Sequence, residues 1–141
     1  MTSQDNENRE EFDALLEDLE SNVVSLELVD FEGTSFKHNT SGASEDQYAS
    51  IKTLYASETA VQVQSITYDG IKYMFLKCIQ DEGKKPVYIF ISTEADKDGI
   101  KKGMFITGFF TYALIATFEH KKINKATAKI ISVLEEYQVE E

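Results

Sequence analysis

The chain has 141 residues, of which 42% are hydrophobic and 28% are charged, and its formal net charge is -11. These values predict one folded domain with its own core, and they exclude a wholly disordered chain. The most apolar run, 104–118, is interrupted by a glycine and by threonines and falls short of the roughly 20 apolar residues of a membrane span. We therefore interpret this run as two buried strands.

The negative charge is concentrated in the first half of the chain. Residues 1–60 contain 14 acidic and 3 basic residues, whereas residues 61–141 contain 11 of each. The sequence thus offers no domain-wide basic surface, which argues against nucleic-acid binding by general electrostatics. Cys78 is the only cysteine, so no intrachain disulfide can form. This, and the lack of a basic start followed by an apolar stretch, favours a cytoplasmic location.

The first residues are polar, and an amphipathic helix is expected after them. Residues 1–8 predict a disordered tail ahead of a single domain that covers 9–141. Apolar side chains recur at i, i+3, i+4 and i+7 from Phe12 to Leu19. That spacing predicts a helix over residues 9–20, with one face directed at the core.

A hairpin and a second helix are expected next. Apolar residues alternate with Ser25 and Glu27, which predicts a half-buried strand over 23–31 that pairs with 34–38. Ser44 followed by Gln47 has the spacing of a capping box. Apolar residues at helical spacing follow them, so a helix over about 44–56 is expected.

The rest of the chain predicts strands joined by short turns, which implies antiparallel pairing. Asp69-Gly70 is the strongest hairpin signal of the sequence. A final amphipathic helix begins near Ile123. The strands expected in this part cover 61–68, 71–79, 87–93, 103–110 and 112–118.

The sequence contains no recognisable catalytic or metal-binding motif. Cys78 with His38 or His120 is a conceivable nucleophile pair, but a mid-strand cysteine is more commonly a buried, inert thiol. The acidic run 94–99 begins like a calcium loop, yet its twelfth position is Phe105, so a solvated turn is the better interpretation. We therefore expect a protein that is not an enzyme and that has no cofactor and no metal.

Lysines gather at the start of the last helix, at positions 121, 122 and 125. The positive end of the helix macrodipole opposes positive charge there, so helix stability does not explain them. A solvated face and a binding surface both remain as interpretations of this cluster.

Four short stretches, in this order, resemble the profilin family. Residues 12–19 resemble the first profilin helix, and 34–36 lie where profilins carry a tryptophan after the first strand. Residues 69–77 resemble the profilin hairpin with its Gly-x-Lys, and 122–125 resemble the start of the last helix. The resemblance spans about residues 9–137 and rests on the joint order of the stretches, because each is short.

The resemblance implies an α+β fold and an actin-binding function. The expected fold has a central antiparallel sheet of about 5–7 strands, with the N- and C-terminal helices packed on one face and a further helix on the other. Profilins bind monomeric actin and regulate its polymerisation, so the resemblance implies a cytoplasmic, cytoskeletal protein that is monomeric. The residues implicated in actin binding are Lys72, Met74, Phe75, Leu76, Lys77, Met104, Ile106, Lys122, Asn124 and Lys125.

Two further profilin ligands are expected to be bound weakly or in an altered way. Profilins hold polyproline on aromatic rings between the terminal helices, and the groove positions here would be Phe12, Leu15, Phe36, Val133 and Tyr137. The chain has no tryptophan, so indole donors for proline carbonyls are missing. This difference and the acidic N-terminal half make the chain more similar to archaeal, Asgard-type profilins than to animal or plant profilins. Anionic phosphoinositide head groups are a third possible ligand, through lysines 84, 85, 101, 102, 121 and 122.

Three other interpretations of the sequence stay open. A roadblock- or longin-like α/β scaffold module that dimerises is the main alternative, and a homodimer without actin affinity would favour it. A small-molecule sensor domain would need a ligand-sized cavity, against which the crowded aromatic residues near 105–118 argue. An enzyme has no support from any motif.

Overall fold

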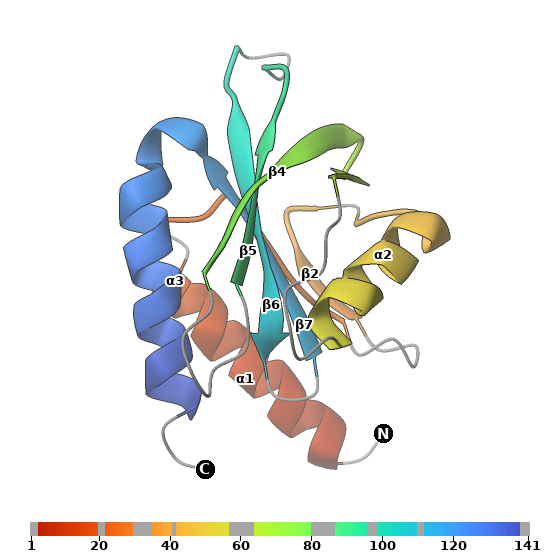
Figure 1. Ribbon diagram of the computed structural model, residues 1–141. Coiled ribbons are helices and arrows are strands. Elements are labelled where there is room, and N and C mark those ends of the chain that lie inside the picture. Colours follow the sequence, from red (N-terminus) through yellow and green to blue (C-terminus); the bar gives the residue numbers. More distant parts are fainter. Residues whose placement is uncertain are drawn as a thin grey trace.

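The computed structural model describes residues 3–19, 22–29, 35–40, 42–56, 64–79, 87–95, 99–109 and 112–138. Within them the chain forms three α-helices and one seven-stranded antiparallel sheet, which confirms the expected α+β class (Figure 1). The helices are α1 (Ser3–Leu19), α2 (Glu45–Ala56) and α3 (Ile123–Gln138). The strands are β1 (Ser25–Val29), β2 (Ser35–His38), β3 (Ser65–Tyr68), β4 (Ile71–Ile79), β5 (Val87–Ser92), β6 (Lys102–Phe109) and β7 (Tyr112–Glu119).

The sheet separates two apolar clusters. Its strand order is β2-β1-β7-β6-β5-β4-β3. On one side, Phe12, Leu15 and Leu19 of α1 join Ala126 and Ile130 of α3 in one buried cluster with the sheet. We call this side the α1/α3 face. On the other side, Ile51 of α2 belongs to a second cluster, and we call this side the α2 face. Figure 1 shows α1 and α3 across the sheet from α2.

The first helix is longer than its apolar pattern predicts. It begins at Ser3, so residues 3–8, expected as a disordered tail, form its first turns, and only residues 1–2 of that tail lie outside the described part. Acidic residues at positions 5 and 7 are favoured near a helix N-terminus, because the macrodipole is positive there. Apolar periodicity locates the core-facing stretch but not a polar extension of the same helix.

The β3–β4 hairpin forms as predicted. Asp69 and Gly70 have φ values of 54° and 76°, the left-handed conformation that a two-residue turn requires at both central positions. Residues on β3 and β4 then pair in register from Tyr68 with Ile71 to Ser65 with Met74. Residues 61–63, expected as the start of β3, lie outside the described part of the chain.

The sheet is curled, so that its far ends approach each other. The hydroxyl of Tyr68, on the last strand in the order, donates to Glu27 on β1, near the opposite end, at 2.7 Å. The segment that follows β2 reaches β3 as well, because the backbone N–H of Asp69 donates to the Gly42 carbonyl at 2.7 Å. Helix α2 packs against the inside of this curl, where Ile51 joins the buried cluster of the sheet (Figure 1).

Helix α2 begins where its capping signal predicts, but its glutamine has a different role. Ser44 directly precedes the helix, and its carbonyl accepts the N–H of Tyr48. The Gln47 Oε1 accepts the backbone N–H of Thr67 on β3 at 2.8 Å. The glutamine therefore bonds an outward N–H of the edge strand, which a sequence pattern local to α2 does not reveal.

Candidate functional site

Strand β4 carries five of the predicted actin-binding residues, and a β-bulge divides them between the two faces of the sheet. Tyr73 is buried in the cluster of the α2 face, so alternation directs Lys72 and Met74 to the α1/α3 face. The ring of Phe75 contacts Phe90 on the α2 face, with centroids 5.7 Å apart. The pairing register with β5 then shifts between Phe75 and Lys77, which marks the bulge.

After the bulge the alternation is inverted. Cys78 packs against the cluster of the α2 face and Ile79 against that of the α1/α3 face, so Leu76 points to the α2 face and Lys77 to the α1/α3 face. Phe75 and Leu76 are thus neighbours on the same face and are 40% and 43% exposed. They are the exposed large hydrophobic residues among those described. The sequence predicted one surface, whereas the structure distributes these residues over two.

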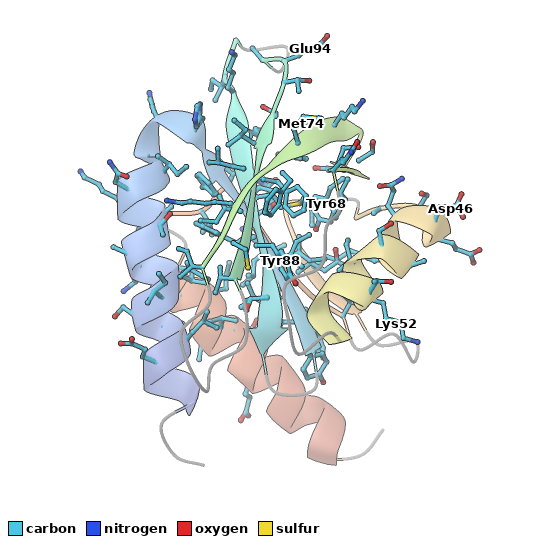
Figure 2. The ribbon with its side chains drawn as sticks, viewed as in Figure 1. Asp46, Lys52, Tyr68, Met74, Tyr88 and Glu94 are labelled. Atoms are coloured by element: carbon cyan, nitrogen blue, oxygen red, sulfur yellow. The ribbon has the colours of Figure 1, made fainter. Side chains whose placement is uncertain are left out.

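The α1/α3 face connects β4 with the start of α3. The register places Met74 opposite Ile91, Ile91 opposite Gly103, and Gly103 opposite Phe118. Three strand spacings, about 14 Å in all, therefore separate Met74 from Phe118. Phe118 is followed by Glu119 and then by the 3-10 turn His120–Lys122 that leads into α3. Met74 and the first turn of α3 thus lie at the same end of the sheet, as Figures 1 and 2 also show.

The start of α3 presents polar and basic side chains to solvent. Lys122, Asn124 and Lys125 are exposed. The N–H of His120 donates to the Lys101 carbonyl at 2.9 Å, so a further exposed lysine lies beside this turn. The pair between Lys121 and Glu119, at 3.6 Å, is solvent-exposed and contributes little to stability.

We define the basic surface as Lys72, Met74 and Lys77 of β4 together with Lys122, Asn124 and Lys125 of α3. The three β4 side chains point to the α1/α3 face, and Met74 is half-buried between its two exposed lysine neighbours. This surface unites six of the ten residues predicted for actin binding. Protein interfaces commonly combine an apolar centre with a polar rim, and this surface has one half-buried apolar side chain among exposed polar and basic ones.

Two predicted actin contacts are wrong as surface residues. Met104 and Ile106 of β6 are both fully buried, with 0% of their surface exposed, in the cluster under α2. Strand β6 is central in the sheet and is covered on both faces, so its residues 103–108 are all buried, whichever face they point to. A partner has no access to these side chains.

The predicted polyproline groove is filled by the core of the protein. Phe12, Leu15 and Val133 are 1%, 0% and 1% exposed, and all belong to the cluster between the sheet and the terminal helices. Phe36 is half-buried and packs against Phe12, with ring centroids 5.6 Å apart and the rings tilted. The side chain of Tyr137 lies outside the described part. The described groove positions therefore offer no open aromatic platform for a proline-rich peptide.

Sequence reasoning missed a buried acidic site on β1. Glu27 is fully buried on the α2 face, although the alternating pattern predicts it on the exposed side of the strand. Its Oε1 accepts the hydroxyl of Tyr68 at 2.7 Å, and its Oε2 accepts the hydroxyl of Tyr48 at 2.6 Å. Strand β1 pairs on both sides and both its faces are covered, so all five of its residues are buried. A charged residue within a strand gives no local signal for such burial.

The two tyrosines of this site are held in their protonated form. Burial, and then the charge of Glu27, raises the pKa of Tyr68 above the ordinary value. Burial, and then the hydrogen bond to Glu27, raises the pKa of Tyr48 in the same direction. Both hydroxyls are thus donors at any physiological pH, which matches a carboxylate that accepts from both.

The described residues show neither a metal site nor a reactive thiol. No group of three or more His, Cys, Asp or Glu side chains in them is placed to hold a metal ion. Cys78 is half-buried and burial raises the pKa of its thiol, the direction that lowers nucleophilicity. Residues 96–98 of the acidic run and Lys84 and Lys85 lie outside the described part. None of the described helices has the length and apolarity to cross a membrane.

No protein-family model matches the chain, and no match is found among curated proteins or solved structures. A functional assignment therefore rests on the fold and on the surfaces described above.

Proposed function

We propose that the chain is a profilin-like protein that binds monomeric actin through the basic surface and thereby regulates actin polymerisation. The observation that carries the proposal is the convergence of two distant segments. Lys72 and Met74 of β4 and residues 122–125, which belong to stretches that resemble profilin motifs in the sequence, lie at one end of the same sheet. The placement of both terminal helices on one face of an antiparallel sheet supports the same proposal.

The mechanism begins with electrostatic attraction. The protein as a whole is acidic, with a net charge of -11, so its overall charge repels an acidic partner and the lysines at this end supply the local attraction. They orient the protein toward an acidic surface of actin and raise the association rate at low salt. Burial of the half-exposed Met74 side chain in the centre of the contact then supplies apolar stabilisation.

The experiment is calorimetric titration of monomeric actin with the wild type and with the double variant Lys72→Glu/Lys125→Glu. The matched control is Arg9→Glu/Lys52→Glu, which changes the net charge equally but on α1 and α2. We expect binding by the wild type and the control and a loss of at least about tenfold in affinity for the double variant. Absence of binding by the wild type would refute the function, and equal binding by all three would refute the basic surface as the site.

Dimerisation is the second candidate function, and one observation favours it. Phe75 and Leu76 form an exposed apolar pair on the α2 face, away from the basic surface. A scaffold module of the roadblock or longin type would use such a pair to associate with a second copy. A dimer in light scattering that the variant Leu76→Ser converts to a monomer, together with no affinity for actin, would favour this function over the first.

Binding of proline-rich peptides is proposed to be weak. Phe12, Leu15 and Val133 fill the core instead of lining a groove. Phosphoinositide binding, if present, would use Lys101 and the lysines at the start of α3, which are exposed at one end of the sheet.

A further inference from the structure

Glu27 is the point at which three parts of the fold meet. Its carboxylate is fully buried on β1, and its two oxygens accept hydroxyls from Tyr48 on α2 and Tyr68 on β3. Neither element pairs with β1 through its backbone, since β1 lies between β2 and β7. A buried carboxylate is costly without such partners, so the two bonds form together with the docking of α2 and the curl of the sheet.

The segment around α2 is joined to β3 by further hydrogen bonds. The N–H of Thr67 donates to the Gln47 side chain, and the N–H of Asp69 donates to the Gly42 carbonyl. The Gly42 N–H donates to the Thr40 hydroxyl at 3.0 Å. Residues 42–47 and the β3 edge therefore hold together by polar contacts, and Glu27 connects both to the far end of the sheet.

Polar side chains take part in the docking of α2 beside apolar ones. Among the α2 side chains that the structure describes, residues 45–53, Ile51 is fully buried, Tyr48 and Gln47 are half-buried, and the charged residues are exposed. The labelled Asp46 and Lys52 point away from the sheet in Figure 2. Hydrogen bonds to Glu27 and Thr67 thus hold the first turn of α2 beside the buried Ile51.

We propose that α2 is a lid over the α2 face and that the Glu27 carboxylate is its latch. When the latch is intact, Tyr48 fixes the first turn of the helix above the buried tyrosines of the sheet. When it is broken, α2 swings away about the segment before it, where Gly42 has a φ of 82°, while β5, β6 and β7 keep their pairing. The opened lid exposes an apolar surface that includes Tyr68, Tyr73 and Tyr88.

The inference is independent of actin binding, because the basic surface involves β4 and α3 and lies on the opposite face of the sheet from α2. A failure of one proposal leaves the other intact. The latch also requires two acceptor oxygens, which a carboxyl group offers to the two hydroxyls and a side-chain amide does not.

Hydrogen–deuterium exchange read by mass spectrometry tests the lid in the full-length chain at neutral pH. The variants are Tyr48→Phe, which removes one hydroxyl, and Glu27→Gln, which replaces one acceptor oxygen with a donor. The matched control is Lys52→Ala, on the same helix and exposed. We expect exchange in α2 to be at least about tenfold faster in both variants, unchanged in the control, and unchanged in β5–β7 for all.

Two results would overturn the proposal. Exchange in α2 that is the same in Tyr48→Phe as in the wild type would show that the latch does not hold the helix. An equal increase in α2 and in β5–β7 would show that Glu27 and Tyr48 support the whole fold and not a lid. If Glu27→Gln does not fold, Tyr48→Phe, which preserves the ring, decides between these outcomes alone.

Discussion

The Tyr68 hydroxyl makes the stability of the protein sensitive to alkaline pH. Tyr68 is fully buried, and burial and the adjacent Glu27 charge raise its pKa in the fold, whereas a tyrosine in the unfolded chain titrates near 10. A raised pKa means that the unfolded chain loses the proton first. The contribution of the protonated Tyr68 hydroxyl to the free energy of unfolding is therefore complete below pH 10 and is lost progressively above it.

Because the pKa of Tyr68 in the folded protein lies above pH 11, the size of this pH effect follows from the ionisation of the tyrosine in the unfolded chain alone. At pH 11 the unfolded hydroxyl is about ten to one ionised, which lowers the free energy of unfolding by about 1.4 kcal/mol relative to pH 8. The variant Tyr68→Phe has no hydroxyl to ionise here, so its free energy of unfolding lacks this pH-dependent contribution. The substitution also leaves the Glu27 carboxyl group with one hydrogen-bond donor fewer, which lowers the free energy of unfolding by about 1–3 kcal/mol at neutral pH.

The assay is urea unfolding of wild type and Tyr68→Phe at pH 8 and pH 11, followed by circular dichroism. We expect the variant to have the lower free energy of unfolding at pH 8. At pH 11 the difference in free energy of unfolding between the two proteins should be about 1.4 kcal/mol smaller. Tyr48→Phe is the comparison: the pKa of the half-buried Tyr48 is raised in the same direction, so its difference from the wild type should also narrow, by no more than that of Tyr68→Phe. A gap for Tyr68→Phe that stays constant, or widens, between the two pH values would refute the reasoning.

Three further predictions follow from the turn, the core and the thiol. Gly70→Ala should cost about 1 kcal/mol in urea unfolding, because φ is 76° there but an added Cβ meets no atom within 4 Å. Gly103→Ala should lower the free energy of unfolding more, by about 1–3 kcal/mol in the same assay, since the new Cβ would overlap the ring of Phe118 that lies on this glycine. Equal losses of stability for the two variants would contradict the packing argument. Cys78 should react with a thiol reagent at pH 8 about tenfold more slowly in the folded protein than in urea, because burial raises its pKa, and equal rates would contradict its burial.

The elements of this fold were predictable because each leaves a local signal. The spacing of Phe12 and Leu19, the Asp69-Gly70 turn and the alternation along β1 all depend on neighbouring residues, and all produce the expected elements. The extension of α1 to Ser3 has no apolar pattern, so its sequence resembles that of a tail.

The candidate site was predictable in part, and its errors have a common cause. Whether Met104 faces a partner or the core depends on which helix covers β6, and this is a property of the whole fold. The bulge after Phe75 inverts the face of every later residue of β4, and nothing in the sequence from 71 to 79 announces it. Glu27 is buried for the same non-local reason, because its partners are 21 and 41 residues away.

The hydrogen bonds from Gln47 and Gly42 to β3 bear on whether other chains can pair with this edge of the sheet. The outermost strand of a sheet is normally a template on which another chain can add a strand, and proteins avoid edge-to-edge aggregation by blocking it. Here the N–H groups of Thr67 and Asp69, on and just after the outermost strand, are already occupied by the chain's own side chain and carbonyl. The protein thus caps its own sheet at this edge, so an extended foreign segment finds these two donors engaged.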